Sequence, residues 1–175
     1  SENPDSVITG NWSNDLLLLM KAVGDANLDV TFGTIFMDQP GNVANAGNVA
    51  KGHYVAHSSN IELLDEAGTE AYKKATGHYP VFIEPTTLNG VGLFAEALKK
   101  VDFEGGDINV DEIALAMENT TFDNGLGGMH VREADHQAVI PIVVSQVASD
   151  VKYPVDGTEL GFKPVKTVAG ADAIY

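Results

Sequence analysis

Hydrophobic and polar positions alternate in short blocks along the first part of the chain. A β-branched run, DSVITG, is followed by the leucine-rich stretch NWSNDLLLLMKAVGDAN and by a second apolar run, LDVTFGTIFM. Short apolar runs bounded by turn residues are typical of buried strands, and the four consecutive leucines suit a helix that packs on a sheet. Residues 6–37 therefore predict one βαβ unit, which requires parallel strands and a right-handed crossover.

The pattern changes after this unit. DQPGNVANAGNVAKG is rich in Gly and Asn but lacks the GxGxxG order and the GK[ST] ending of phosphate-binding loops, so we expect an irregular loop. GHYVAHSS follows as a third extended run, and then three helical patterns succeed one another at 61–77, 86–101 and 109–120. A βαβ unit followed by helices and then by strands is typical of an α/β or α+β fold.

Polar residues at the expected helix starts predict N-caps, because a short side chain there accepts hydrogen bonds from free N–H groups. The expected caps are Ser13 or Asn14, Thr86 or Thr87, and Asn109, which has Glu112 at capping-box spacing. These helices are interpreted as packing elements rather than as sites.

The stretch GLGGMHVREADHQAVIPIVVSQV, residues 125–147, raises the question of a catalytic site. MHVRE and AVIPIVVSQVA have strand character, and the polar READHQ between them holds Asp135, which suits a turn. A hydrolase using Asp135 and His136 would need a nucleophile and a group that orients the imidazole, and no HExxH, GxSxG or His-x-His spacing is present. A β-hairpin is the favoured interpretation and a hydrolase the remote alternative. No catalytic residue, metal ligand or cofactor is predicted.

Charge and composition narrow the choice of partners. The 175 residues include 25 acidic and 10 basic ones, a formal net charge of -15 that disfavours binding to nucleic acid or to anionic lipid. The absence of cysteine excludes disulfides and thiolate chemistry. No apolar run reaches the roughly 18 residues of a membrane span, and the first residues lack the blocks of a signal peptide. Either export was never intended or a targeting segment has been removed.

The best candidate for a binding site lies in the turns after the first two predicted strands, because ligands of parallel sheets bind beyond the carboxyl ends of the strands. TGNWSND holds the only tryptophan, whose ring could cover an apolar or aromatic ligand or could serve in packing. In FMDQPG, the acid could meet a ligand ammonium and the glutamine could donate or accept, although both also suit a plain turn. The predicted ligand-binding residues are Asn11, Trp12, Ser13, Asp38 and Gln39.

Six segments follow one another in a familiar order: VITGNWSNDLLLLMKA, FMDQPG, AKGHYV, AYKKATG, LFAEALKKV and TFDNGLGGMHVREADHQ. In this order they resemble the second half of type I periplasmic substrate-binding proteins of ABC transporters, and more narrowly the branched-chain amino acid receptor group. The resemblance covers most of the chain, and the DHQ-containing stretch makes it fairly specific.

This resemblance implies an α/β fold, namely a three-layer periplasmic-binding-protein type I lobe with a parallel sheet, present as a partial, C-terminal fragment. Residues 1–56 and 125–175 would resemble the C-terminal lobe, and the helices of 57–122 the returning part of the N-terminal lobe. The DHQ segment would lie in a hairpin near the last crossover and shape the hinge.

The implied function is that of a non-enzymatic solute receptor, which closes two lobes around a small amino acid or a related carboxylate or amide. Trp12 falls where relatives present an aromatic side chain to the ligand. Pro40 stands close to the position of their acidic residue, with Asp38 two residues earlier. The partner would be an ABC permease, and the location the periplasm or the cell exterior. A ligand sensor for signalling or gene regulation is the alternative.

Overall fold

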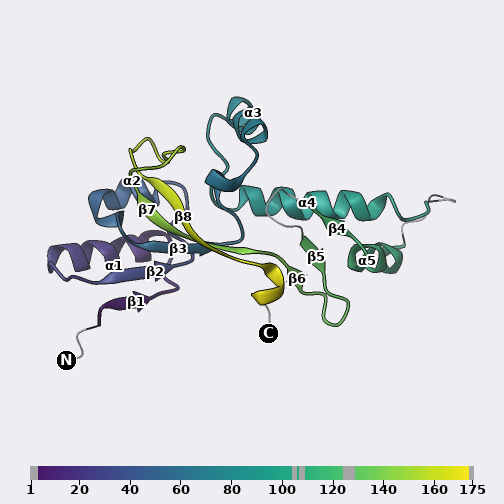
Figure 1. Cartoon of the computed structure of the whole chain (residues 1–175), viewed down its shortest axis with the longest axis horizontal. Helices are drawn as coiled ribbons and strands as arrows, with labels where there is room; N and C mark the ends of the chain where they lie inside the picture. The colour runs from purple at the N-terminus through teal and green to yellow at the C-terminus, as the bar shows by residue number, and fades with distance from the viewer. Residues whose placement is uncertain (1–3, 104–105, 107–108, 124–128, 174–175) are drawn as a thin grey trace.

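The computed structural model describes residues 4–103, 106, 109–123 and 129–173. Its main element is a five-stranded sheet with the order β1-β2-β3-β7-β8 (Figure 1). The strands are β1 (Ser6–Ile8), β2 (Thr31–Thr34), β3 (Tyr54–His57), β7 (Ile142–Ala148) and β8 (Gly161–Val168). The first three pair in parallel, which confirms the predicted βαβ unit, whereas β7 and β8 are antiparallel to their neighbours.

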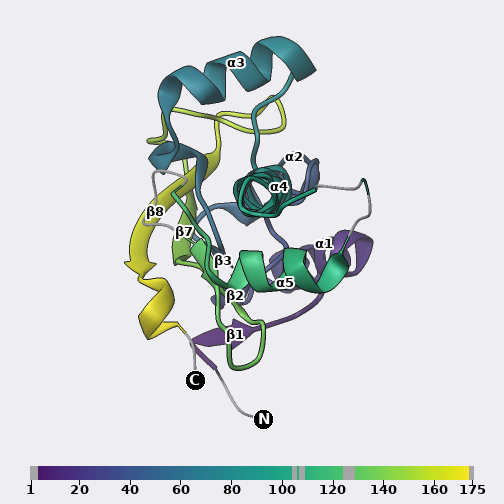
Figure 2. The same cartoon turned by 90° about the vertical axis from the view of Figure 1, so that its right-hand side faces the viewer.

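Helices on one side of this sheet close the core (Figure 2). They are α1 (Ser13–Asp25), the short α2 (Asn42–Ala46) and the 3-10 turn η1 (Gly47–Ala50). Leu16 and Met20 of α1 are fully buried and belong to one cluster with Val55 of β3 and Phe162 of β8. Each buried side chain of this size contributes about 1.5–3 kcal/mol, so the start and the end of the chain stabilise each other.

A second group of elements extends beyond one end of the five-stranded sheet (Figure 1). Its helix α4 packs against α5 and a small sheet of order β4-β5-β6. These and the remaining elements are η2 (Ile61–Leu63), α3 (Glu66–Thr76), α4 (Glu84–Leu98), α5 (Val110–Glu118), β4 (Thr121–Phe122), β5 (Met129–Val131), β6 (Ala138–Val139) and η3 (Gly170–Asp172). Among the residues that the structure describes, no helix combines the length and apolar character that crossing a bilayer requires. The assignment of 1–56, 57–122 and 125–175 to two lobes stays a prediction.

The first strand is not buried as expected. Ile8 is 93% exposed, because β1 is the edge strand and pairs only with β2 within the described part of the chain. The second strand is also shorter than its apolar run, since β2 ends at Thr34 and the chain bends after it.

The expected irregular loop at residues 38–52 is wrong, since it contains α2 and η1. Asp156, in the loop between β7 and β8, accepts hydrogen bonds from the N–H groups of Gly41, Val43 and Ala44 at 2.8, 3.1 and 3.4 Å. A carboxylate at this place satisfies the free donors of the first turn of α2. The α2 helix was not predicted because Asp156, the acid that caps it, lies 115 residues from Gly41 in the sequence.

One predicted helix start is confirmed and another is wrong. The side chain of Asn109 accepts hydrogen bonds from two backbone N–H groups in the first turn of α5. By contrast, α4 begins at Glu84, so neither Thr86 nor Thr87 caps it. The start is explained by Pro85, whose fixed φ and missing N–H suit a first helical turn.

The apolar run AVIPIVVSQVA is not one strand. β6 ends at Val139 and pairs with β5, which confirms the predicted hairpin, while β7 begins at Ile142 and joins the five-stranded sheet. Pro141 lies between them and cannot donate to a ladder. β8 was not predicted; its residues after Phe162 are partly or fully exposed, and its register against β7 shifts between Pro164 and Lys166.

Candidate functional site

The turn after β1 is built by local polar contacts. The backbone N–H of Asn11 donates to Thr9 Oγ1 at 3.1 Å, and the Asn11 side chain contacts Thr9 and Asp15. Trp12 is the N-cap residue of α1 without a side-chain cap bond, so the predicted caps Ser13 and Asn14 are wrong. Asn11 links the two sides of the turn through these side-chain contacts, and Trp12 is 60% exposed.

The turns after β1 and β2 meet, as expected for parallel neighbours. The backbone N–H of Ser13 donates to Gln39 Oε1 at 2.9 Å. Ser13 has a φ of 52°, a left-handed conformation that is uncommon outside glycine. Gln39 is therefore used to join two turns, and it holds the Trp12 turn beside the Asp38 turn.

Asp38 is the buried acid among the predicted residues. Its side chain is 5% exposed, and its Oδ1 has no hydrogen-bond partner within the described ranges. Burial is the main reason that the pKa of Asp38 is raised to about 7; a backbone hydrogen bond opposes the rise and the nearby charge of Glu84 adds to it. The carboxyl group can therefore change its charge near neutral pH.

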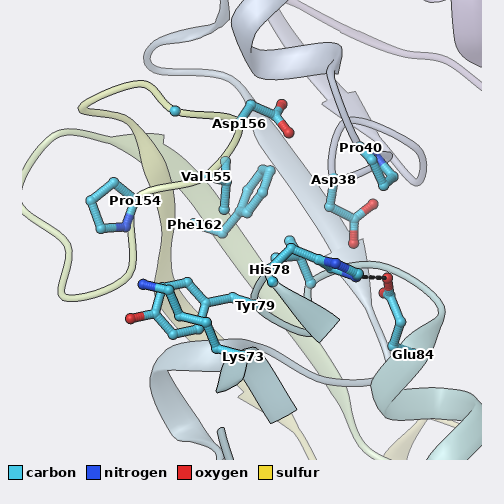
Figure 3. Close-up of a pocket in the computed structure, with 13 residues that line it drawn as sticks. Asp38, Pro40, Lys73, His78, Tyr79, Glu84, Pro154, Val155, Asp156 and Phe162 are labelled. Atoms are coloured by element: carbon cyan, nitrogen blue, oxygen red, sulfur yellow. Dashed lines mark ion pairs between the residues drawn. The ribbon is translucent and has the colours of Figure 1, made fainter. Parts of the chain in front are cut away.

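Asp38 faces a cavity of about 530 Å³ (Figure 3). Its walls are Asp38 and Pro40 after β2, the connector between α3 and α4, residues 154–157 of the β7–β8 loop, and Phe162. Most of this lining is apolar, with a few polar groups, which is the usual composition of a small-molecule site. Trp12 does not line this cavity, so the structure separates the two strongest sequence candidates.

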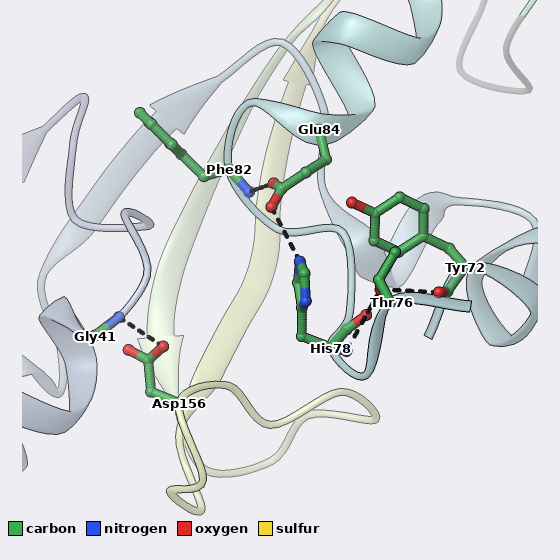
Figure 4. Close-up of polar contacts among 7 residues, drawn as sticks. All are labelled: Gly41, Tyr72, Thr76, His78, Phe82, Glu84 and Asp156. Atoms are coloured by element: carbon green, nitrogen blue, oxygen red, sulfur yellow. Dashed lines mark hydrogen bonds and ion pairs between the residues drawn. The ribbon is translucent and has the colours of Figure 1, made fainter. Parts of the chain in front are cut away.

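Most of the charged groups around the cavity already have partners. Glu84 accepts a hydrogen bond from the backbone N–H of Phe82 at 3.0 Å and lies 3.4 Å from His78 Nε2 (Figure 4). Lys73 Nζ lies 4.0 Å from the centroid of the Tyr79 ring. Asp156 caps α2, as described above, which leaves Asp38 as the cavity acid without a charged partner among these groups.

Apart from Asp38 and Pro40, the residues that line the cavity were missed from the sequence, and Tyr79, Glu84 and Phe162 are examples. Each lies on a segment that is remote in sequence from Asp38, and none belongs to a motif. The apolar run around Tyr79 and the proline after Glu84 were visible, but only the fold brings them to the end of β2.

The acid and imidazole of the hairpin engage different partners. Asp135 binds the guanidinium of Arg132 with both carboxylate oxygens, and this contact lowers the pKa of Asp135 to about 2. Its Oδ1 also accepts from the N–H of Gln137 at 3.1 Å, which confirms the predicted turn. His136 Nε2 instead lies 2.8 Å from Glu118 Oε1 on α5. The pair expected for a hydrolase is therefore not assembled.

A metal centre is not apparent either. Within the residues that the structure describes, no group of three or more His, Asp or Glu side chains is arranged to hold an ion.

Comparison with known proteins assigns the chain to a family. The family model described as "Periplasmic binding protein" matches residues 1–152. "Leu/Ile/Val-binding protein homolog 4" of Brucella abortus (strain 2308) is 50% identical over 98% of this chain, which covers 42% of that protein. The chain thus spans less than half the length of the curated relatives it matches.

Solved structures agree with this result. The leucine-, isoleucine-, valine-, threonine- and alanine-binding protein of Brucella ovis, in a closed conformation, is 49% identical with a TM-score of 0.94, over 99% of this chain and 45% of that one. A second solved structure is a solute-binding protein of an ABC transporter from Rhodopseudomonas palustris BisB5, in complex with 3,4-dihydroxybenzoic acid. It has a TM-score of 0.70 at 23% identity, over 95% of this chain and 46% of that one. At this identity the match shows the fold alone. The chain belongs to the periplasmic binding protein family, of the type I fold found in ABC transporter receptors.

Proposed function

We propose that this chain is part of a solute receptor for an ABC importer, and that it acts by binding rather than by catalysis. The receptor would work in the periplasm or outside the cell and deliver its ligand to an ABC permease. Its lobes would close around the ligand, because a ligand stabilises the closed state through contacts that the open state lacks. The observation that carries this proposal is membership of the family together with 50% identity to a Leu/Ile/Val-binding homologue.

We propose further that the ligand is a small amino acid or a related carboxylate or amide. The exposed ring of Trp12 offers an apolar surface at the carboxyl end of β1, and the contact between Ser13 and Gln39 holds it next to the Asp38 turn. A large aromatic side chain is favourable against an apolar ligand body. Asn11 and Gln39 would add polar contacts, since amide side chains both donate and accept.

Asp38 would face a positively charged group of the ligand. Its carboxyl group is buried and lines the large cavity, and burial of a carboxylate without a counter-charge is costly unless a cation or a donor meets it. A ligand ammonium beside Asp38 would favour the charged carboxylate, so binding would lower the pKa of Asp38 from about 7.

A thermal-shift screen against amino acids, aromatic carboxylates, amides and urea tests the proposal, run on the longest gene product that contains this chain. A ligand at 100 times its Kd stabilises the native state by about 2.7 kcal/mol, equivalent to a rise in Tm of about 5–10 °C for a domain of roughly 150–250 residues. Trp12→Ala should abolish the rise. Phe103→Ala is the matched control, because Phe103 is also an exposed aromatic residue but lies far along the chain, after α4.

The outcomes distinguish the receptor function from the proposed role of Trp12 in the binding site. A shift that persists in Trp12→Ala would retain the receptor and remove Trp12 from its site. If no compound of these classes shifts the Tm, solute capture is contradicted and a protein partner becomes the better hypothesis.

A further inference from the structure

A second, much smaller cavity is also lined by Asp38. Its volume is about 10 Å³, and it shares Asp38, Val81 and Phe162 with the large cavity, so the two cavities adjoin. Five polar side chains line it: Asp38, His57, Ser59, Asn60 and Ser145.

Three of these side chains have a buried polar atom without a protein partner. Within the described part of the chain, four buried side-chain atoms lack one, namely Asp38 Oδ1, His57 Nδ1, Ser59 Oγ and Thr69 Oγ1. The first three all belong to residues lining the small cavity, whereas Thr69 lies elsewhere. Buried polar groups in native proteins nearly always have a partner, so three that border one cavity indicate a shared one.

The remaining polar groups of the wall are already engaged. The Asn60 amide donates to Ser145 Oγ at 2.8 Å and to the Phe162 carbonyl at 2.7 Å. These bonds occupy the Asn60 amide and leave Asp38, His57 and Ser59 to hydrogen-bond an occupant.

The size of the cavity limits the occupant to one small molecule. A volume of about 10 Å³ corresponds to roughly one water, which also needs two to four polar partners. We propose that this cavity binds a single water molecule, which joins Asp38 to His57 and Ser59 and makes these two residues positioning residues for the Asp38 carboxyl group. The inference rests on the cavity alone and holds whether or not the chain binds a solute.

The protonation states fit a water that donates to two groups and accepts from a third. Burial lowers the pKa of His57, so its imidazole is neutral near pH 7 and Nδ1 can accept. A carboxylate oxygen of Asp38 also accepts, and the hydroxyl group of Ser59 can donate to the water. The water would therefore favour the charged form of Asp38 and oppose the effect of burial.

Other charged groups near Asp38 come from separate elements. Glu84 at the start of α4 repels the carboxylate, His78 of the connector is paired with Glu84, and Asp156 is held by α2. Lys73 lies over Tyr79. Because none of them belongs to the small cavity, a change at Ser59 tests the water without altering these charges.

The test combines a crystal structure that resolves ordered water with a carbon-13 NMR titration of Asp38. We expect one water in the small cavity, within hydrogen-bond distance of all three atoms. In Ser59→Ala the pKa of Asp38 should rise by roughly 0.5–1 unit, the equivalent of one hydrogen bond. Ser59→Thr keeps the hydroxyl group and should retain the original pKa. Thr69→Ala, which removes the other unpartnered hydroxyl group, should leave the pKa of Asp38 unchanged.

Three results would overturn the proposal. The first is an unoccupied cavity, and the second is an Asp38 pKa that is the same in Ser59→Ala and in the unchanged protein. The third is an occupant seen only in crystals grown with ammonium salts, which would make the cavity an ammonium site instead. Should Ser59→Ala fail to fold, the occupancy of the small cavity in the crystal structure of the unchanged protein still decides the question.

Discussion

Replacing Asp156 by glycine should unfold the start of α2 more readily and destabilise the whole protein. Asp156 accepts from three N–H groups of the β2–α2 turn, at 2.8, 3.1 and 3.4 Å (Figure 4 shows the shortest). It also has a φ of 56°, a conformation that glycine adopts freely and alanine does not. Glycine therefore removes the carboxylate without adding backbone strain.

The magnitude follows from these contacts. Loss of an N-cap acceptor costs typically about 1 kcal/mol, and up to about 2 kcal/mol where the acceptor is charged. Asp156 is exposed, so solvent screening keeps the expected loss in Asp156→Gly at about 1–2 kcal/mol, or about 2–8 °C in Tm. Asp156→Ala should lose about 1–2 kcal/mol more, because a left-handed φ is unfavourable for a residue with a Cβ atom.

Urea unfolding followed by circular dichroism would give these changes in the free energy of unfolding. Amide hydrogen exchange would show which part of the chain is destabilised. The N–H groups of Gly41, Val43 and Ala44 should exchange faster in Asp156→Gly. Asn27→Gly is the matched control, since Asn27 also has a positive φ (51°) but caps no helix start. The reasoning is refuted if Asp156→Gly is as stable as the unchanged protein, or if those three amides keep their protection.

Two further predictions concern packing and pH. Gly92→Ala should destabilise the protein by about 1–3 kcal/mol in urea unfolding, because a Cβ would lie 2.4 Å from the Phe122 ring. Gly90→Ala is the control: the space around Gly90 is open, so this change should be neutral or stabilising. Equal free energies of unfolding in the two variants would contradict the role of the Phe122 contact. Asp38 has a folded pKa of about 7, above an unfolded value of roughly 4, so its stabilising proton is fully bound below about pH 4 and is lost as the pH rises through 7. Unfolding measured at pH 5 and pH 8 should therefore show a loss on the order of 2–4 kcal/mol that Asp38→Asn largely removes; an identical loss in the variant would show that Asp38 is not its source.

Local sequence patterns predicted what depends on neighbours in the chain. The βαβ unit, the Asn109 cap and the Asp135 turn each rest on residues a few positions apart, and each is present. The start of α4 was misplaced within that range, because the influence of Pro85 outweighed that of the threonines after it.

The α2 helix and the cavity could not be predicted from local sequence patterns, because both depend on residues that only the fold brings together. The α2 helix has only a weak local signal and takes its cap from Asp156. The cavity combines the end of β2, the α3–α4 connector and the β7–β8 loop, and no spacing in the sequence joins them. Asp38 and Trp12 were both predicted from the rule that ligands bind beyond the carboxyl ends of parallel strands. The rule identified a region of the fold, but it could not predict that Asp38 lines the large cavity and Trp12 does not.

The pairing of β3 with β7 has a consequence for synthesis of the chain. Tyr54 and Gln146, which face each other in this ladder, are 92 residues apart. At about 5–20 residues per second, β3 leaves the ribosome on the order of 5–20 s before its partner exists. During that interval the strand edge around Val55 and the apolar face of α1 lack the β7 and β8 side chains that bury them. Nascent chains that stall before β7 should therefore aggregate or recruit chaperones, whereas chains that stall after β8 can close their core.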